Sequence, residues 1–468
     1  MSSDLQIIII QIYRFFYSVS KSPCREILLY MEEMLKTVFA GCSDLVSRRA
    51  GDCEIIYFET LVNKELVSRF VCLPLIEGMT PDALPLIKTE RIEEQNAAAA
   101  LCSGAAVITR GNELWSAAVK SDRGRSPHEP ETENVIRGPH DGFTESAEYN
   151  MGLLRRIIRS PELKFEKHTA GKETRTDVDL VWIEGKADGV VVDLLRQRID
   201  AIKTPTILDS GYVEELVSVP PGKRNFKLYP SMGNSERPDK VAGKLLEGRA
   251  AVIVDGSPVV LTAPYLFVEA FQSSEDYVKS VWYAFFVRFL RFAAFFITLY
   301  LPAVFVALMY FHEDLVPKTF FDYYSEHSAG MMPLFLEVIA VFFLFELVRE
   351  VGLCMPKAVG GAVGILGSLI LGDAAVEAGI TSASVIIIIA ASAMCNFIAP
   401  PFFNSNVPLR LLLLVAARLG GLYVLVPTAF FVFVCFASKR SFGVPYLYPI
   451  VPFSLRGMGD VIYKRPLK

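Results

Sequence analysis

The chain has 468 residues, of which 52% are hydrophobic and 21% are charged, and its formal net charge is −4. A charge so close to zero gives no electrostatic case for binding nucleic acid. The charges are unevenly placed, because residues 292–311 contain none and only Arg410 and Arg418 occur between Gly379 and Ala437. We therefore expect an α/β soluble N-terminal half, followed by an all-α polytopic membrane domain.

The N-terminal segment 1–40 is expected to be an extension followed by a helix. Residues 7–16 are mostly apolar, with Gln11 and Arg14 among them, but the stretch is too short to span a bilayer. Because Asp4 precedes it and no basic region or cleavage motif accompanies it, we do not expect a secretory signal peptide. An amphipathic helix, or a start codon assigned upstream of the true one, would account for it. Helical spacing of apolar residues from Arg25 to Phe39 predicts a helix that ends at Gly41.

Residues 41–120 are predicted to form a first cytoplasmic α/β lobe. Residues 53–61 are rich in β-branched and aromatic side chains and predict a strand, and residues 64–73 predict a helix. A hairpin is expected over 105–117, with its turn at Gly111, because glycine adopts positive φ at little cost.

The segment 121–142 is dense in charge, proline and glycine, a composition that cannot build a core. We predict a charged linker or mobile loop there. A helix is expected from Glu145 to Ile158. Three arginines near its C-terminus complement the helix dipole: Arg155, Arg156 and Arg159.

Residues 143–279 are predicted to form a second cytoplasmic α/β lobe related to the first. Its expected elements are strands at 163–169 and 178–184, a helix at 189–202 and a hairpin at 250–262 that turns at Gly256. The stretches GAAVITRGNELWSA and GRAAVIVDGSPVVLTA superimpose, and so do IYFETL and VWIEGK. We interpret this as an internal duplication. The alternative is that any strand, helix and hairpin series looks alike.

Residues 280–437 are predicted to form a membrane domain with four or five spans. Residues 292–311 and 380–399 carry no charge and are long enough to cross a hydrocarbon core of about 30 Å. Residues 411–436 contain Gly420, Gly421 and Pro427 and predict a tilted or kinked span. Two weaker segments are 331–348, which carries carboxylates, and the Gly-rich 358–372.

The orientation follows from basic residues. Lys279, Arg288 and Arg291 precede the first span, and the loop after it is acidic, so the lobes should be cytoplasmic. Five full spans would put the basic C-terminal tail, 438–468, on the opposite side. The conflict would be removed if 358–372 were re-entrant.

No enzymatic motif is present. The five histidines show no metal-ligand spacing, the eight cysteines form no CxxC pair, and no phosphate loop or G-x-S-x-G elbow occurs. We therefore expect no catalytic activity, no cofactor and no metal site.

Ionisable residues within the apolar half are better candidates for function, as ligands on an ion path or as a gate. They are Glu337, Glu346, Arg349, Glu350, Asp373 and Glu377. Glu346, Arg349 and Glu350 share one helical face, and Glu337 has wholly apolar neighbours. The alternative is that these groups only tie helices together. Three glycines predict a close-packing helix face: Gly360, Gly364 and Gly367.

A series of short motifs, in order along residues 40–450, resembles the A subunit of GerA-type nutrient germinant receptors of endospore-forming bacteria. The motifs are Ser43–Val46, Gly142–Glu145, Leu208–Tyr212, Glu236–Lys240, Leu246–Arg249, Val254–Pro258, Phe271–Ser273, Glu275–Tyr277, Leu301–Ala303, the segment around Glu337, Phe345–Glu350, Gly372–Gly379 and Ser441–Tyr446.

The resemblance implies a subunit of a receptor complex in the inner membrane of the spore. Its partners would be a transporter-like B subunit that senses the nutrient, a C-subunit lipoprotein and further copies of the A subunit. The assembly would form a nutrient-gated ion channel that triggers germination. One alternative is the accessory sporulation protein of the dipicolinate-release system, which shares this architecture. A secondary transporter is disfavoured by the few spans and by the absence of a repeat among them.

Overall fold

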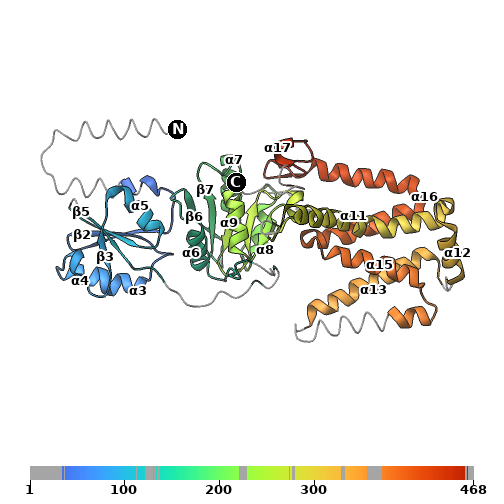
Figure 1. The fold of residues 1–468 in the computed structure, drawn as a ribbon, viewed down its shortest axis with the longest axis horizontal. Helices are drawn as coiled ribbons and strands as arrows, with labels where there is room; N and C mark the ends of the chain where they lie inside the picture. The colour runs from blue at the N-terminus through green and yellow to red at the C-terminus, as the bar shows by residue number, and fades with distance from the viewer. Residues whose placement is uncertain are drawn as a thin grey trace. The chain divides into compact units, whose positions relative to one another are not determined.

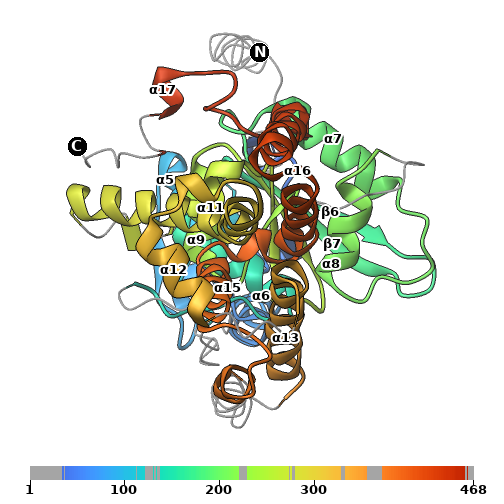
Figure 2. The same cartoon turned by 90° about the vertical axis from the view of Figure 1, so that its right-hand side faces the viewer.

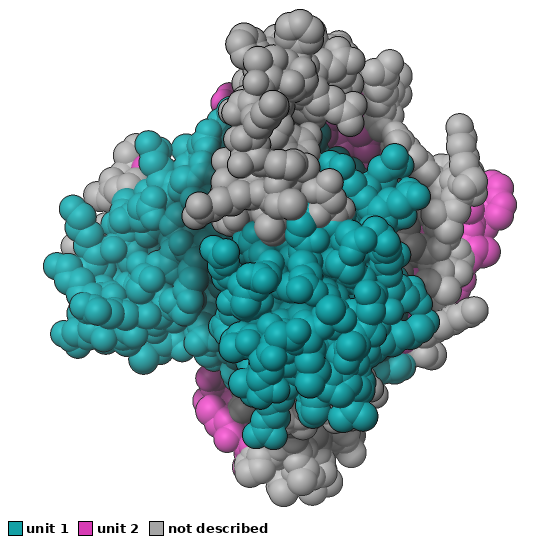
Figure 3. Space-filling model, turned by 90° about the vertical axis from the view of Figure 1, so that its left-hand side faces the viewer, with its two compact units in different colours: residues 1–134, 139–217, 234–262 teal, residues 135–138, 218–233, 263–468 magenta. Residues whose placement is uncertain are grey.

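The computed structural model describes residues 34–35, 37–111, 113–121, 130, 133, 138–220, 229–273, 275–276, 280–327, 332–355, 372–458 and 461. The chain divides into two compact units, coloured separately in Figure 3. Unit 1 comprises 1–134, 139–217 and 234–262, and unit 2 comprises 135–138, 218–233 and 263–468. The apolar stretch at 7–16, most of the 121–142 linker and the 358–371 segment lie outside the described residues.

The first lobe is a five-stranded antiparallel sheet with helices on both faces (Figure 1). Its elements are β1 (Leu45–Ala50), β2 (Cys53–Phe58), α3 (Lys64–Leu66), η1 (Val67–Cys72), α4 (Leu73–Ile76), η2 (Pro81–Ala83), β3 (Thr89–Arg91), α5 (Glu94–Cys102), β4 (Ala106–Arg110) and β5 (Glu113–Ala117). The strand, helix and hairpin predicted here are confirmed. The strands β1 and β3 and the helix α5 were not predicted from the sequence.

Alternation along β2 explains why helices cover both faces of this sheet. Ile55 packs with Val67 and Val71 of η1, whereas Ile56 and Leu101 of α5 belong to the core on the other face. The helical segment after β2 begins at Asn63, whose side chain caps it by accepting hydrogen bonds from the backbone N–H groups of Glu65 and Leu66.

The second lobe repeats this topology. Its elements are α6 (Ala147–Ile157), β6 (Leu163–Ala170), β7 (Thr176–Ile183), α7 (Gly189–Asp200), α8 (Ser210–Val217), β8 (Gly233–Ser235), α9 (Pro238–Leu246), β9 (Ala250–Val254) and β10 (Val260–Ala263). The strand orders are β1-β2-β4-β5-β3 and β6-β7-β9-β10-β8, so each strand has a counterpart in the other sheet. Gly111 and Gly256 turn equivalent hairpins with φ of 59° and 85°. The shared order supports the duplication inferred from the sequence.

Unit 2 is mainly helical. Its elements are η3 (Phe267–Phe271), α11 (Val281–Phe311), η4 (Glu313–Leu315), α12 (Lys318–His327), α13 (Leu334–Cys354), α15 (Ala383–Asn396), η5 (Pro400–Phe402), α16 (Phe403–Ser438), β11 (Arg440–Ser441), β12 (Val444–Pro445) and α17 (Leu455–Met458). Among the described residues, two helical stretches are long and apolar enough to cross a membrane, Val281–Phe311 and Pro400–Ser438. Seen along the bundle, α11 lies among the other helices of unit 2 (Figure 2).

The helix α16 is broken in its middle. Gly420 and Gly421 leave helical geometry, with φ/ψ of −165°/29° and 59°/−141°. The segments 403–419 and 422–438 form two arms that appear as separate helices in Figure 2.

Ring contacts fix the direction of the two arms. Phe402 before the first arm and Phe436 near the end of the second both pack on Phe267, and their own ring centroids are 6.5 Å apart. The Gly421 backbone lies instead against Phe311 and His312, at the far end of α11. The stretch predicted as one tilted or kinked span is therefore a helical hairpin, because positive φ at Gly421 reverses the chain.

Candidate functional site

Glu337 lies in the first turn of α13 and is 6% exposed. Its Oε1 accepts hydrogen bonds from the Thr381 hydroxyl, at 2.9 Å, and from the backbone N–H of Ser382. Ser382 is the N-cap residue of α15, and a helix N-terminus favours a negative charge. Glu337 therefore binds the start of α15 to α13, which is the geometry expected of a residue that ties helices together.

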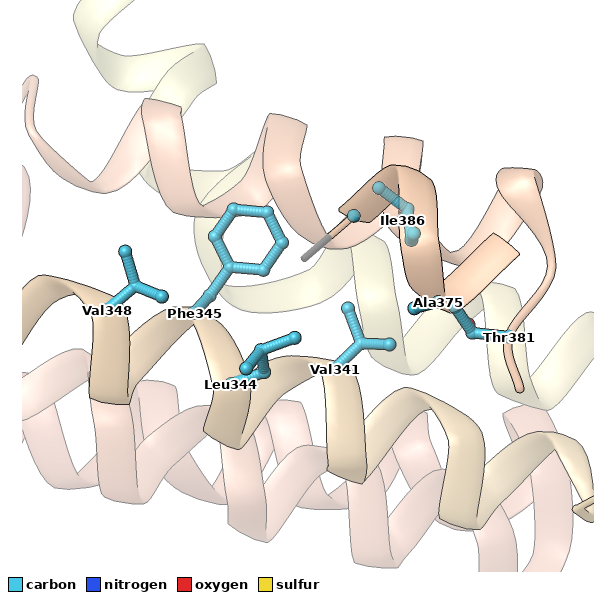
Figure 4. A pocket seen from close by; sticks show the side chains of 8 residues that line it. Val341, Leu344, Phe345, Val348, Ala375, Thr381 and Ile386 are labelled. Atoms are coloured by element: carbon cyan, nitrogen blue, oxygen red, sulfur yellow. The ribbon is translucent and has the colours of Figure 1, made fainter. Parts of the chain in front are cut away.

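A small apolar gap lies beside this contact, between α13 and the segment around α15 (Figure 4). It is lined by Val341, Leu344, Phe345, Val348, Gly372, Ala375, Thr381 and Ile386. Its volume is about 20 Å³, close to the minimum for a single water. A hydrated ion does not fit there.

Farther along α13, Glu346 meets two arginines. Its carboxylate oxygens lie 2.9 Å from Arg349 Nη1 and 4.0 Å from Nη1 of Arg410, which belongs to the first arm of α16. Arg349 Nη2 also lies 3.8 Å from the exposed Glu350. The shared face predicted for the α13 residues thus holds an ion-pair cluster, to which Arg410 adds a charge from a second helix.

Arg410 is a site residue that the sequence analysis did not single out. It is 2% exposed, and its Nε and Nη2 have no hydrogen-bond partner among the described residues. Aromatic faces surround the two arginines: Phe342 lies 5.5 Å from the Arg410 guanidinium, and Phe403 lies 4.5 Å from that of Arg349. A buried arginine inside an apolar bundle is costly, which marks the cluster as a functional candidate. The sequence feature that could have identified Arg410 is that it interrupts a long run of uncharged residues.

The remaining predicted residues do not join this cluster. Asp373 and Glu377 lie exposed on a helical turn at 372–377. The packing glycines Gly360, Gly364 and Gly367 fall outside the described residues. No group of three or more potential metal ligands occurs among the residues that the structure describes.

In unit 1 the two lobes are joined by a buried ion pair. Arg155 of α6 donates to both carboxylate oxygens of Asp44, at 2.6 and 2.7 Å, and both side chains are 2% exposed. The guanidinium lies between the rings of Phe58 and Phe165, 3.8 and 4.7 Å from their centroids. The sequence analysis assigned Arg155 only to the helix dipole. The pair instead connects one residue from each lobe, with an aromatic ring from each around it.

Asp179 is a second buried carboxylate of unit 1, at 2% exposure in β7. Its Oδ1 has no hydrogen-bond partner among the described residues. Burial raises the pKa of Asp179 to about 7, although the nearby Lys167 opposes the shift.

Comparison with known proteins places this arrangement in context. The family model described as Bacillus/Clostridium GerA spore germination protein matches residues 33–468. Spore germination protein KA of Bacillus subtilis (strain 168) is 37% identical, over 88% of this chain and 78% of that protein. The uncharacterized membrane protein YfkQ of the same organism is 34% identical, over 93% and 88%.

A solved structure is also similar to part of this chain. The N-terminal domain of the A subunit of the Bacillus megaterium spore germinant receptor GerK3 is 29% identical, with a TM-score of 0.40, over 53% of this chain and 98% of that chain.

Proposed function

Because this chain belongs to the GerA family of Bacillus/Clostridium spore germination proteins, we propose that it is the A-type subunit of a nutrient germinant receptor. In this proposal it assembles in the spore inner membrane with a transporter-like B subunit, a C-subunit lipoprotein and further copies of itself. The assembly opens an ion channel when nutrient binds. The observation that carries the channel role is the buried cluster of Glu346, Arg349 and Arg410 between two apolar helices.

The ion path is proposed to lie between copies of the chain. Within one chain, the gap between α13 and α15 is apolar and holds about 20 Å³, too little for a hydrated ion. In this proposal the cluster acts as a gate, since Glu346 is shared by Arg349 and by Arg410 of another helix. A shift of α16 relative to α13 would change which of the two arginines the Glu346 carboxylate contacts.

We propose that the lobes and the C-terminal tail share the cytoplasmic side. The reversal at Gly421 brings the end of α16 back toward Phe267, and Lys439 Nζ donates to the backbone oxygen of Tyr229. An α16 hairpin adds one crossing to the count made from the sequence. The basic tail then joins Arg288 and Arg291 on one side without a re-entrant segment.

Cysteine accessibility tests this topology in a background without the eight native cysteines. Engineered cysteines at the exposed positions Lys172, Glu313 and Arg440 report the second lobe, the loop after α11 and the tail. An impermeant reagent should label intact cells only at position 313. Labelling at 172 or 440, with 313 protected, would contradict the proposed orientation.

Germination tests the functional proposal directly. Spores that carry only this chain and its genetic neighbours as receptor genes should release potassium when a panel of amino acids and sugars is added. Spores that lack this chain alone should release none while still germinating with a trigger that bypasses the nutrient receptors. Equal nutrient-triggered release with and without the chain would refute the proposal.

A further inference from the structure

The end of α16 continues into a tight hairpin formed by β11 and β12. Ser441 pairs with Val444, so Phe442 and Gly443 alone form the loop. Both have positive φ, 47° and 89°, which is typical of the type I′ turn that joins two strands through two residues. Phe442 is also buried. A phenylalanine in this region of backbone space is strained, and such strain persists only where the surrounding contacts hold it in place.

The Ser441 hydroxyl joins two segments that are distant in the sequence. Ser441 is fully buried. It donates to the backbone oxygen of Ser231, at 2.7 Å, and accepts a hydrogen bond from the backbone N–H of Tyr265, at 3.0 Å. We call residues 229–231 the entry segment and residues 265–267 the exit segment. One side chain of the hairpin is therefore bonded to both.

Further contacts hold the same two segments. In the entry segment, Lys439 Nζ donates to the backbone oxygen of Tyr229, and the Tyr229 ring packs on Phe436 of α16 with the centroids 3.8 Å apart. In the exit segment, the backbone N–H of Phe267 donates to the oxygen of Tyr446, at 2.9 Å. Each segment is thus fastened at two or more points to the end of α16 or to the residues that follow it.

The chain connects these segments to the sheet of the second lobe. The entry segment leads into β8, which begins at Gly233, and the exit segment follows β10, which ends at Ala263. The strands β8 and β10 are neighbours, and β8 is the last strand of that sheet. The chain that enters the edge strand and the chain that leaves its neighbour are therefore both held by the hairpin.

We propose that the hairpin 440–445 is a clamp that couples the second lobe to the second arm of α16. Because hydrogen bonds hold both segments, they follow the end of α16 instead of acting as free linkers. A displacement of β8 or β10 then reaches α16, whose first arm carries Arg410 of the proposed gate. The clamp rests on the contacts of unit 2, whereas its role in gating rests on the proposed function.

Hydrogen exchange of the purified full-length chain in detergent tests the clamp. Ser441→Ala removes both hydrogen bonds of the hydroxyl. The backbone amides of 229–235 and 260–267 should then exchange about tenfold faster, because two buried hydrogen bonds are lost. Exchange in β7 of the same lobe should not change. Unchanged exchange in both segments, or an equal increase in β7, would overturn the clamp.

Two further variants make the test specific. Ser438→Ala makes the same change three residues earlier, at an exposed position whose hydroxyl donates to the backbone oxygen of Cys435, and should exchange as wild type does. Lys439→Met removes the donor to Tyr229, so it should accelerate exchange more in 229–235 than in 260–267. This variant decides the question if Ser441→Ala does not fold, and wild-type exchange of 229–235 in it would contradict the clamp.

Potassium release from spores tests the coupling. Ser441→Ala should slow nutrient-triggered release by about 2- to 30-fold at the wild-type amount of the chain, the range that substitutions in a coupling element produce, and Ser438→Ala should not. Faster exchange in Ser441→Ala together with wild-type release would overturn the coupling and leave the hairpin a purely structural contact. If the wild-type chain supports no nutrient-triggered release, the gating role falls with the proposed function, and the exchange measurement alone decides the clamp.

Discussion

The contact of Glu337 with the start of α15 predicts different outcomes for two substitutions. Glu337→Ala removes the acceptor of the Thr381 hydroxyl and the Ser382 N–H and leaves both donors buried. Hydrogen bonds to charged groups contribute about 1.5–3 kcal/mol each, although inside membrane bundles values near 0.6 kcal/mol are common. We expect a loss of about 2–5 kcal/mol from these two bonds and the helix-terminus charge together.

Glu337→Gln preserves an oxygen at the same position, so it should cost about 1 kcal/mol or less. The assay is thermal inactivation of the purified full-length chain in detergent, followed by size-exclusion chromatography. Hydrogen exchange at the first turn of α15 should accelerate in Glu337→Ala alone. Glu377→Ala, at an exposed position on the turn at 372–377, is the control and should behave as wild type.

Two results would refute this reasoning. One is that Glu337→Ala inactivates at the same temperature as the wild type. The other is that Glu337→Gln loses as much stability as Glu337→Ala. In spores, Glu337→Gln should also retain nutrient-triggered potassium release at normal protein level. A stable Glu337→Gln chain that releases no potassium would instead assign Glu337 to the cation path.

Three further predictions concern stability of the full-length chain. Asp44→Ala should lower the free energy of unfolding by about 3–5 kcal/mol, because it leaves Arg155 buried and unpaired, and hydrogen exchange in β6 should become faster. The double variant Asp44→Leu with Arg155→Met should recover much of this stability. A double variant no more stable than Asp44→Ala would contradict the prediction. Burial raises the pKa of Asp179 from its ordinary value of 3.8, which applies in the unfolded chain, to about 7 in the folded chain. Ionisation of Asp179 therefore lowers the stability of the fold as the pH rises between these two values. The stability advantage of Asp179→Asn over the wild type should therefore grow from pH 4 to pH 7, reach about 4 kcal/mol and then stay constant. An advantage that does not change with pH would contradict this prediction. Gly421→Ala should abolish folded protein, because residue 421 has a positive φ and its added Cβ would lie 2.8 Å from atoms of His312 and Phe311. Gly352→Ala is the control, since a Cβ there meets open space. Equal yields of the two folded variants would contradict the hairpin.

Elements with a strong local pattern were predictable. The strands around Ile56 and Val181 and the hairpins at Gly111 and Gly256 follow from β-branched side chains and glycine turns. The strand β1 was missed because it carries Arg48 and Arg49 at an edge of the sheet, where side chains can remain in solvent.

Features that depend on distant residues were not predictable from local pattern. The helix α5 is a run of alanines with little contrast between its faces, so its burial against β2 leaves a weak periodic signal. Gly420 and Gly421 indicated a kink, but only the packing of Gly421 on Phe311 determines a full reversal. Arg410 was visible as a charge in an apolar run, and its partner Glu346 lies 64 residues earlier, where spacing rules do not reach.

The most direct test of the proposed channel role compares Glu346→Gln, Arg410→Gln and Arg418→Gln in spores that depend on this chain. Arg418 lies exposed on the same arm of α16 as the buried Arg410, so it is the matched control. Nutrient-triggered potassium release is measured together with the amount of the chain in the spore membrane. The proposed gate predicts altered release in the Glu346 and Arg410 variants at wild-type protein level, and unchanged release in Arg418→Gln. Wild-type release kinetics in all three variants would contradict it.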